Sequence, residues 1–156
     1  MPKLSLAVSC HGHLILSARA TTGAGGDQPR SEPLALGAWH RVPNRSFKVV
    51  ADAGFDSEPN HEVARHDMGL RSLIPPDIGR PRLDGGPPGG RWRGHMKRLL
   101  ATKQGRRRSG YTQRWQVETV NSMVKRNLGS ALSGKTAWSR KRDMRLKALT
   151  HDLMVL

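Results

Sequence analysis

The chain has 156 residues, of which 36% are hydrophobic and 4% aromatic, with 17 glycines and 10 prolines. This composition fits one domain with a lean core and much loop. The single cysteine, Cys10, excludes an internal disulfide framework and a cysteine-rich zinc site. The sequence has no stretch of 18 apolar residues and does not begin like a signal peptide, so we expect a cytoplasmic protein without a membrane partner.

The formal net charge of +15 is concentrated in one part of the sequence. Residues 1–90 hold 10 basic and 9 acidic side chains, whereas residues 91–150 hold 17 basic and 2 acidic ones. Nucleic acid is the expected partner, because each neutralised phosphate releases condensed counterions. An anionic membrane surface and mere solubility are the alternatives. One run of basic residues, Arg106-Arg107-Arg108, is expected to contact DNA phosphates, unless it is a solvated loop.

The first predicted elements are strands. Alternating apolar and polar residues over 4–9, resumed over 13–18, predict a β-hairpin. A loop rich in glycine follows, and apolar residues spaced by four predict a helix over 34–42. The β-branched run at 47–51 predicts a buried strand. This strand places Asp52 directly at its C-terminal end.

The remaining elements alternate between helix and strand. Ser57 can cap a helix that ends at about Met68, where Gly69 supplies the left-handed stop, and residues 70–74 predict a short strand. From about 76 to 109 glycine, proline and arginine dominate, which predicts an exposed basic insertion. Strands alternating with helices predict an α/β layer architecture. Two further helices are expected over residues 110–127 and 139–156.

Asp52 is the first candidate for chemistry. Ligands of open α/β sheets bind at the carboxyl ends of the strands, which is where this carboxylate lies. The alternative is that Asp52 only opens a turn, as aspartate often does close to glycine.

The second candidate is a polar stripe on the helix expected from residue 110. At 100° per residue, four polar side chains fall within an arc of about 60°, well away from the apolar valines of that helix. Glu118 is an isolated acid in a positive field, where a metal and phosphates would account for it. A solvated helix face is the alternative. The stripe consists of Tyr111, Arg114, Glu118 and Lys125.

These residues match a known pattern, Y-x2-R-x3-E-x6-K. All four positions agree with the signature that brackets the catalytic glutamate in bacterial insertion-sequence DDE transposases of the IS-four type, which the chain resembles. The run from Asp52 to Asp56 is similar to the D-x-G-[YF]-D block around the second catalytic aspartate of that family. The resemblance extends over nearly the whole chain and is weakest over residues 21–45 and 76–108.

The resemblance implies an RNase H-like fold, a mixed sheet flanked by helices, in which two aspartates and a glutamate hold two Mg²⁺ or Mn²⁺ ions. On this sequence Asp52 would be the second aspartate and Glu118 the glutamate, both of them catalytic metal ligands. Arg114 and Lys125 would contact phosphates of the transposon end, and Tyr111 beside them would be a further DNA-binding residue.

One part of the family pattern is missing. The first catalytic aspartate of the family lies on the central strand of the sheet, before the hairpin, and this sequence starts after it. Asp27 and Asp56 lie on the wrong elements to replace it. We therefore expect residues 1–156 to be one N-terminally truncated catalytic domain that lacks its first strand.

The expected function is DNA transposition, through DNA binding and metal-dependent strand cleavage and transfer, in an inactive or impaired fragment. Transposon ends and target DNA are the expected partners, a homodimer is one possible assembly, and the bacterial nucleoid is the expected location. The alternative is a basic nucleic-acid-binding module without catalysis, in which the carboxylates are inherited but unused.

Overall fold

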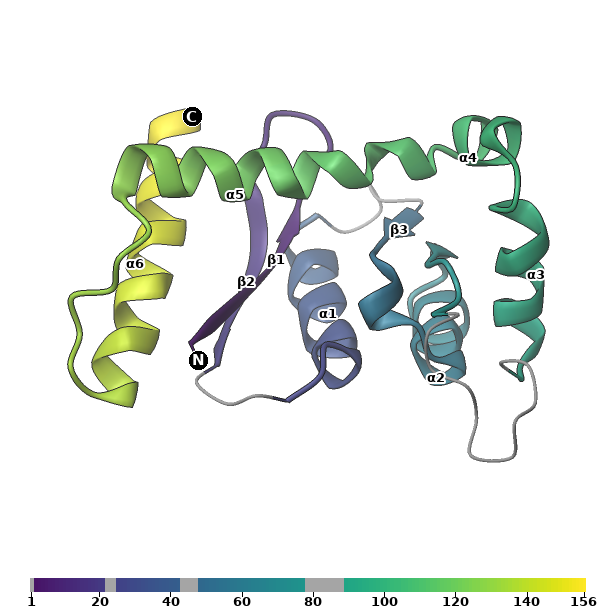
Figure 1. Ribbon diagram of the computed structural model, residues 1–156, viewed down its shortest axis with the longest axis horizontal. Helices are drawn as coiled ribbons and strands as arrows, with labels where there is room; N and C mark the ends of the chain where they lie inside the picture. The colour runs from purple at the N-terminus through teal and green to yellow at the C-terminus, as the bar shows by residue number, and fades with distance from the viewer. Residues whose placement is uncertain (1, 22–24, 43–47, 78–88) are drawn as a thin grey trace. The chain divides into compact units, whose positions relative to one another are not determined.

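The computed structural model describes residues 2–21, 25–42, 48–77 and 89–156. The chain divides into two compact units, which are treated one at a time. Unit 1 comprises Met1–Gly25 and Trp115–Leu156, and unit 2 comprises Gly26–Arg114. Strands and helices alternate along much of the chain (Figure 1), which confirms the predicted α/β class. None of the helices in the described ranges is long and apolar enough to cross a bilayer.

Unit 1 is a hairpin covered by two helices. β1 (Lys3–Val8) and β2 (Ile15–Thr21) pair antiparallel, as the alternating pattern predicts. α5 (Trp115–Leu128) packs on β1, and α6 (Ala137–Val155) packs on β2 (Figure 1). The apolar side of the hairpin meets the apolar stripe of α5 in one core cluster. Its buried members are Ile15, Val120, Val124 and Ala148.

Local signals set the ends of both helices. α5 ends before Gly129, whose φ of +76° is the left-handed conformation that stops a helix. α6 starts at a capping box, in which the Thr136 hydroxyl accepts from the Ser139 amide and the Ser139 hydroxyl accepts from the Thr136 amide. The carboxylate of Asp152 accepts the amide of Ile15 at 2.7 Å. This bond fastens α6 to the hairpin.

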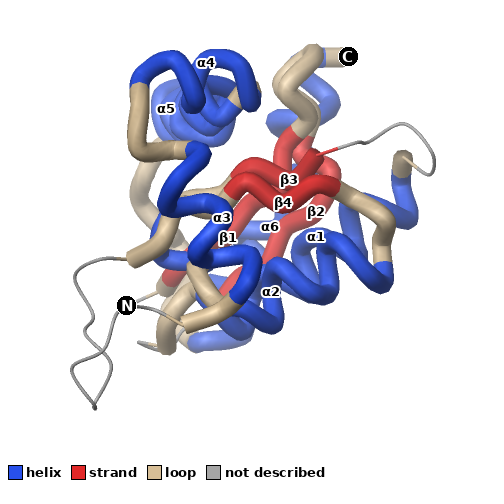
Figure 2. The backbone as a smooth tube through the Cα atoms, turned by 90° about the vertical axis from the view of Figure 1, so that its right-hand side faces the viewer, coloured by secondary structure: helices blue, strands red, loops and turns tan. Residues whose placement is uncertain are grey.

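Unit 2 is built around a short parallel strand pair. β3 (Lys48–Val50) pairs with β4 (Arg71–Leu73), and the two appear among the red strands of Figure 2. β4 buries Ser72 and Leu73, but the described residues of β3 are half-buried or exposed. The prediction of a buried strand at 47–51 is therefore wrong for the residues described, because β3 has one paired neighbour among them. Phe47 lies outside the described residues.

The connection from β3 to β4 follows the predicted helix. The Ser57 hydroxyl accepts the Asn60 amide at 3.2 Å and caps α2 (Glu58–Glu62), which continues as a π-helical turn over Val63–Asp67. Gly69, with φ of +67°, ends this turn as predicted. A further helix, α1 (Ser31–Arg41), precedes β3 and buries Leu34.

The segment predicted as an exposed insertion is helical and partly buried over residues 91–109. It contains two helices, α3 (Arg91–Leu99) and α4 (Lys103–Ser109), while residues 78–88 lie outside the described residues. Met96 is completely buried and Leu100 is 3% exposed, and both pack with Leu73 of β4. The prediction of an exposed insertion is wrong for Met96 and Leu100, because the dense arginines hide an apolar stripe with helical spacing.

Candidate metal and DNA-binding site

Asp52 lies at the carboxyl end of β3. The Ala51 amide donates to the Leu73 carbonyl at 3.1 Å, so the parallel pairing continues up to the residue before Asp52. The Asp52 side chain is 64% exposed, and among the described residues it makes no capping hydrogen bond to the 3₁₀ turn Ala53–Phe55 that follows. The carboxylate is thus presented at the sheet edge, whereas a side chain that merely opened the turn would bond to it.

A second segment of unit 2 packs against β3. Arg114 Nη1 lies 3.9 Å from Asp52 Oδ1, which is a loose ion pair between two partly exposed groups. At the start of β3, Lys48 Nζ donates to the Ser109 carbonyl at 3.0 Å. The segment 109–114, which includes the turn Tyr111–Arg114, therefore contacts β3 near both ends of the strand.

The structure changes the predicted polar stripe. Residues Tyr111–Arg114 form a 3₁₀ turn that belongs to unit 2, and α5 starts only at Trp115. Because residues three apart eclipse in a 3₁₀ helix, Tyr111 and Arg114 share a face of this turn, not a face of α5. Tyr111 is half-buried against the cluster of Leu73, Met96 and Leu100. The prediction that one helix carries all four polar residues is therefore wrong.

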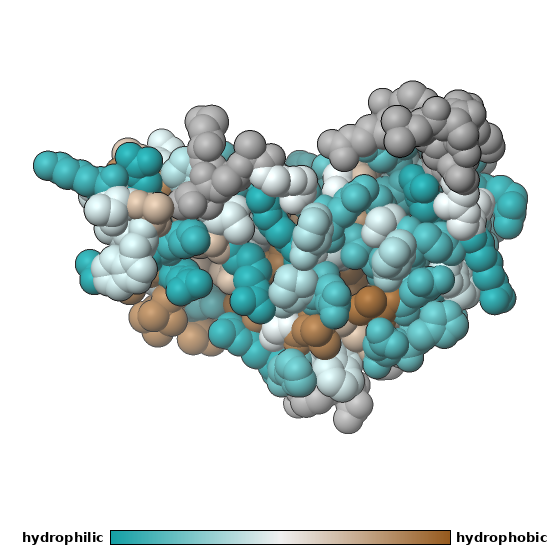
Figure 3. Space-filling view, turned by 90° about the horizontal axis from the view of Figure 1, so that it is seen from below, coloured by the Kyte–Doolittle hydropathy of each residue, from teal (hydrophilic) through white to brown (hydrophobic). Residues whose placement is uncertain are grey.

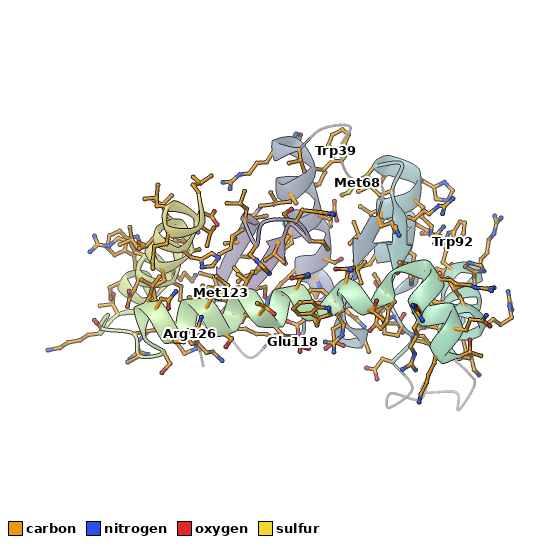
Figure 4. The ribbon with its side chains drawn as sticks, turned by 90° about the horizontal axis from the view of Figure 1, so that it is seen from above. Trp39, Met68, Trp92, Glu118, Met123 and Arg126 are labelled. Atoms are coloured by element: carbon orange, nitrogen blue, oxygen red, sulfur yellow. The ribbon has the colours of Figure 1, made fainter. Side chains whose placement is uncertain are left out.

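The rest of the stripe lies on α5 as expected. Glu118 and Lys125 are exposed, while Val120 and Val124 are buried in the core of unit 1. Figure 4 labels Glu118 on this helix. Glu118 belongs to unit 1 and Asp52 to unit 2, and their sharing of one metal site stays a prediction.

The three arginines of the basic cluster lie on a helix and differ in their hydrogen bonding. All three arginines of Arg106-Arg107-Arg108 are exposed on α4. The Nε of Arg106 donates to the Leu100 carbonyl at 2.7 Å, which satisfies the C-terminal end of α3. Hydrophilic side chains also cover much of the face drawn in Figure 3. A phosphate contact by Arg107 and Arg108 stays a prediction that their exposure permits.

A buried ion pair that sequence reasoning missed lies close to Asp52 in the chain. Asp56 is 1% exposed and accepts from Arg93 Nε at 2.9 Å and from the Asp77 amide at 2.8 Å. The hydrogen bond with Asp56 raises the pKa of Arg93 above its ordinary value. The signal in the sequence was the second aspartate of the D-x-G-[YF]-D block, but its partner is 37 residues away.

A buried histidine adjoins the same strand pair. His61 Nδ1 lies 2.7 Å from the Ser72 hydroxyl oxygen, and this oxygen accepts from Arg65 Nε at 2.8 Å. His61 Nε2 is buried and finds no partner among the residues that the structure describes. Burial, opposed by the carboxylates of Asp56 and Glu58, lowers the pKa of His61 below its ordinary value of 6.5.

This histidine predicts a pH-dependent stability. Because the folded chain binds the His61 proton less readily than the unfolded chain, its contribution is complete above about pH 6.5 and is lost as the pH falls toward the lower folded pKa. We expect the urea midpoint to drop between about pH 7 and pH 5.5, and His61→Gln to reduce this drop. His11→Gln, at an exposed position, is the control. An equal drop in wild type and His61→Gln would contradict the prediction.

The donor chemistry at Asp52 suits a hard divalent ion. An exposed carboxylate oxygen is the kind of ligand that Mg²⁺ takes. The guanidinium of Arg114 lies beside the Asp52 carboxylate, so this carboxylate already has a positively charged neighbour. Within the described ranges, no three histidine, cysteine, aspartate or glutamate residues lie together as a metal-holding group. The exposed carboxylate of Asp52 thus fits the role of one metal ligand, and its role in a metal site stays a prediction.

Comparison with known protein families gives a match over nearly the whole chain. Residues 1–153 match the family described as the transposase DDE domain. A search of the curated proteins and a search of the solved structures each found no match.

Proposed function

Since this chain belongs to the transposase DDE-domain family, we propose that it binds DNA and supplies carboxylate ligands for metal-dependent strand cleavage and transfer. The observation that carries this proposal is the exposed carboxylate of Asp52 at the end of a parallel strand, with Arg114 beside it. The IS-four assignment remains a prediction from the sequence resemblance.

In this proposal the residues have separate roles. Divalent ions, when bound, supply an activated oxygen nucleophile and stabilise the leaving oxygen. Asp52 and Glu118 would hold two Mg²⁺ or Mn²⁺ ions, and Arg114 and Lys125 would hold phosphates close to them. Tyr111 would act through its ring, which packs against the core of unit 2 and fixes the turn that carries Arg114.

The second candidate is a nucleic-acid-binding module without catalysis. The net charge of +15 supports it, because charge alone is sufficient for DNA binding that is not specific for sequence. The two candidates differ in what Asp52 does. A homodimer and a location at the bacterial nucleoid are further proposals, which size-exclusion chromatography and fluorescence microscopy of a tagged chain would test.

Metal binding separates the two candidates. We expect Mn²⁺ at millimolar concentration to raise the melting temperature of the full chain, and Asp52→Asn or Glu118→Gln to remove most of this increase, because each substitution deletes a charged ligand. Asp67→Asn is the matched control, since Asp67 is exposed in unit 2 and has no proposed role. If Mn²⁺ leaves the melting temperature of the wild type unchanged, the module without catalysis is the better description.

DNA binding should depend steeply on salt. We expect replacement of Arg106-Arg107-Arg108 by alanine to reduce the slope of log affinity against log salt by up to about 3, with Arg106 contributing least because its Nε is bonded to Leu100. The measurement is fluorescence anisotropy of a labelled mixed-sequence duplex at several salt concentrations. An unchanged slope would remove α4 from the interface.

A further inference from the structure

The helices α3 and α4 carry an unusual charge and an unusual attachment. Residues 91–109, here called the basic arm, contain eight basic and no acidic residues. Such a segment would repel itself as a free loop, yet the structure holds it on unit 2 through four attachments, two of which use the buried side chains of Asp56 and Met96. These attachments indicate that the arm has a fixed position on unit 2.

The first attachment is the pair of Arg93 and Asp56. Arg93 Nε lies 2.9 Å from both carboxylate oxygens of Asp56, and Nη2 donates to the same carboxylate. The Asp56 side chain is fully buried, and that of Arg93 is 18% exposed. Because two nitrogens of a planar guanidinium are bonded, this pair fixes orientation as well as distance.

The second attachment lies at the N-terminus of α3. The Glu58 carboxylate accepts the amides of Trp92 at 2.9 Å and Arg93 at 3.1 Å, which are donors that an isolated helix end would leave unsatisfied. Gly90 has a φ of +126°, and a Cβ at this position would collide with the Glu58 carboxylate. A residue with a Cβ would have to displace this carboxylate and would also be strained at this φ.

The third and fourth attachments hold the rest of the arm. Met96 is buried against Leu73 of β4, and Lys48 of β3 donates to the Ser109 carbonyl at the end of α4. The arm is therefore fastened to both strands of unit 2, near the start and the end of β3. Figure 4 labels Trp92 at the beginning of the arm.

The first attachment is connected to Asp52 through a short turn. The Phe55 amide donates to the Asp52 carbonyl at 3.0 Å, and the Asp56 amide donates to the Ala53 carbonyl at 2.9 Å. Asp56 thus ends the same 3₁₀ turn that Asp52 begins. Arg93 is therefore bonded to a residue only four positions after Asp52 and in the same turn.

We propose that Asp56, Glu58 and Arg93 are positioning residues, which dock the basic arm in fixed register with Asp52. Phosphates bound by Arg107 and Arg108 are then held at a defined place relative to the carboxylate that ligates the metal. This inference rests on the proposed function, because docking of the arm matters for DNA processing only if the chain binds DNA. The docking itself is testable without DNA.

The first experiment measures docking in the full chain. Spin labels at Lys103→Cys and Asp67→Cys, in a Cys10→Ser background, report the distance from the arm to the end of the β3–β4 connection. Both labelled positions are exposed. We expect a narrow distance distribution, broadened by Asp56→Asn and by Gly90→Ala. Gly94→Ala is the matched control in the same helix, because a Cβ there meets no atom within 4 Å. A distribution that stays narrow in both variants would overturn the proposal.

The second experiment asks whether docking serves DNA binding. Affinity for a mixed-sequence duplex is measured with and without the alanine triple at Arg106-Arg107-Arg108, in wild type and in Asp56→Asn, at a temperature where circular dichroism shows all four proteins folded. We expect the triple to weaken binding severalfold less in Asp56→Asn, because undocked arginines are no longer pre-organised. An equal effect in both backgrounds contradicts the positioning role. If wild type does not bind DNA at low salt, the proposed function fails, while the distance measurement still decides the docking.

Discussion

Asp56→Ala should lower the free energy of unfolding by about 3–5 kcal/mol, a large share of the stability of a domain of this size. The substitution leaves the guanidinium of Arg93, whose side chain is 18% exposed, without its carboxylate. It also leaves the Asp77 amide without its acceptor. Urea unfolding of the full chain, followed by tryptophan fluorescence, measures the loss, since Trp92 adjoins Arg93 in the sequence.

Two controls isolate the ion pair. Asp67→Ala removes an exposed carboxylate from the same unit and should change stability by no more than about 0.5 kcal/mol. The double variant Asp56→Leu with Arg93→Met leaves no buried charge behind, so it should be more stable than Asp56→Ala alone. A loss below about 1 kcal/mol in Asp56→Ala would show that solvent reaches Arg93 and replaces its partner.

The elements that the sequence predicted well are those with local causes. Alternation over residues 4–9 is enough to make a hairpin strand, because one face of a strand repeats every second residue. Ser57 caps α2, while Gly69 and Gly129 end their helices, all by hydrogen bonding or backbone freedom within one turn. Such signals do not depend on the rest of the chain.

The elements that the sequence did not predict depend on distant partners. In the basic arm, Trp92, Met96 and Leu100 recur every four residues, but arginines surround them and suggest a solvated loop. The helix is stable because Leu73, more than 20 residues earlier, provides an apolar surface. The same cluster holds Tyr111, which favours a 3₁₀ turn where the sequence predicted the start of a long helix.

The candidate site shows the same division. Asp52 and Asp56 belong to one short motif, and nothing in the motif distinguishes their burial. In the structure the Asp52 carboxylate is exposed and the Asp56 carboxylate is buried. The difference arises from Arg93, which lies 37 residues after Asp56 in the sequence and bonds to its carboxylate. The strand end that presents Asp52 is a local feature and was predicted, whereas the long-range contact that buries Asp56 was not.

Met96→Ala should destabilise the chain by about 2–5 kcal/mol. Met96 is completely buried between the arm and the strand pair, so the substitution removes its transfer free energy and opens a cavity against Leu73 and Leu100. Urea unfolding of the full chain measures the loss. Because Met96 carries no charge, this result tests packing of the arm independently of the ion pair at Asp56.

Two methionine controls make the test specific. Met154→Ala truncates a side chain that is 56% exposed on α6, so it should have little effect. Met96→Leu nearly conserves volume and should cost less than about 1.5 kcal/mol. If Met96→Ala is as mild as Met154→Ala, the arm does not share the core of unit 2, and its arginines would then reach DNA as a tethered segment without a fixed register to Asp52. A loss in the expected range, recovered in Met96→Leu, means instead that the arm and the strand bearing Asp52 unfold together.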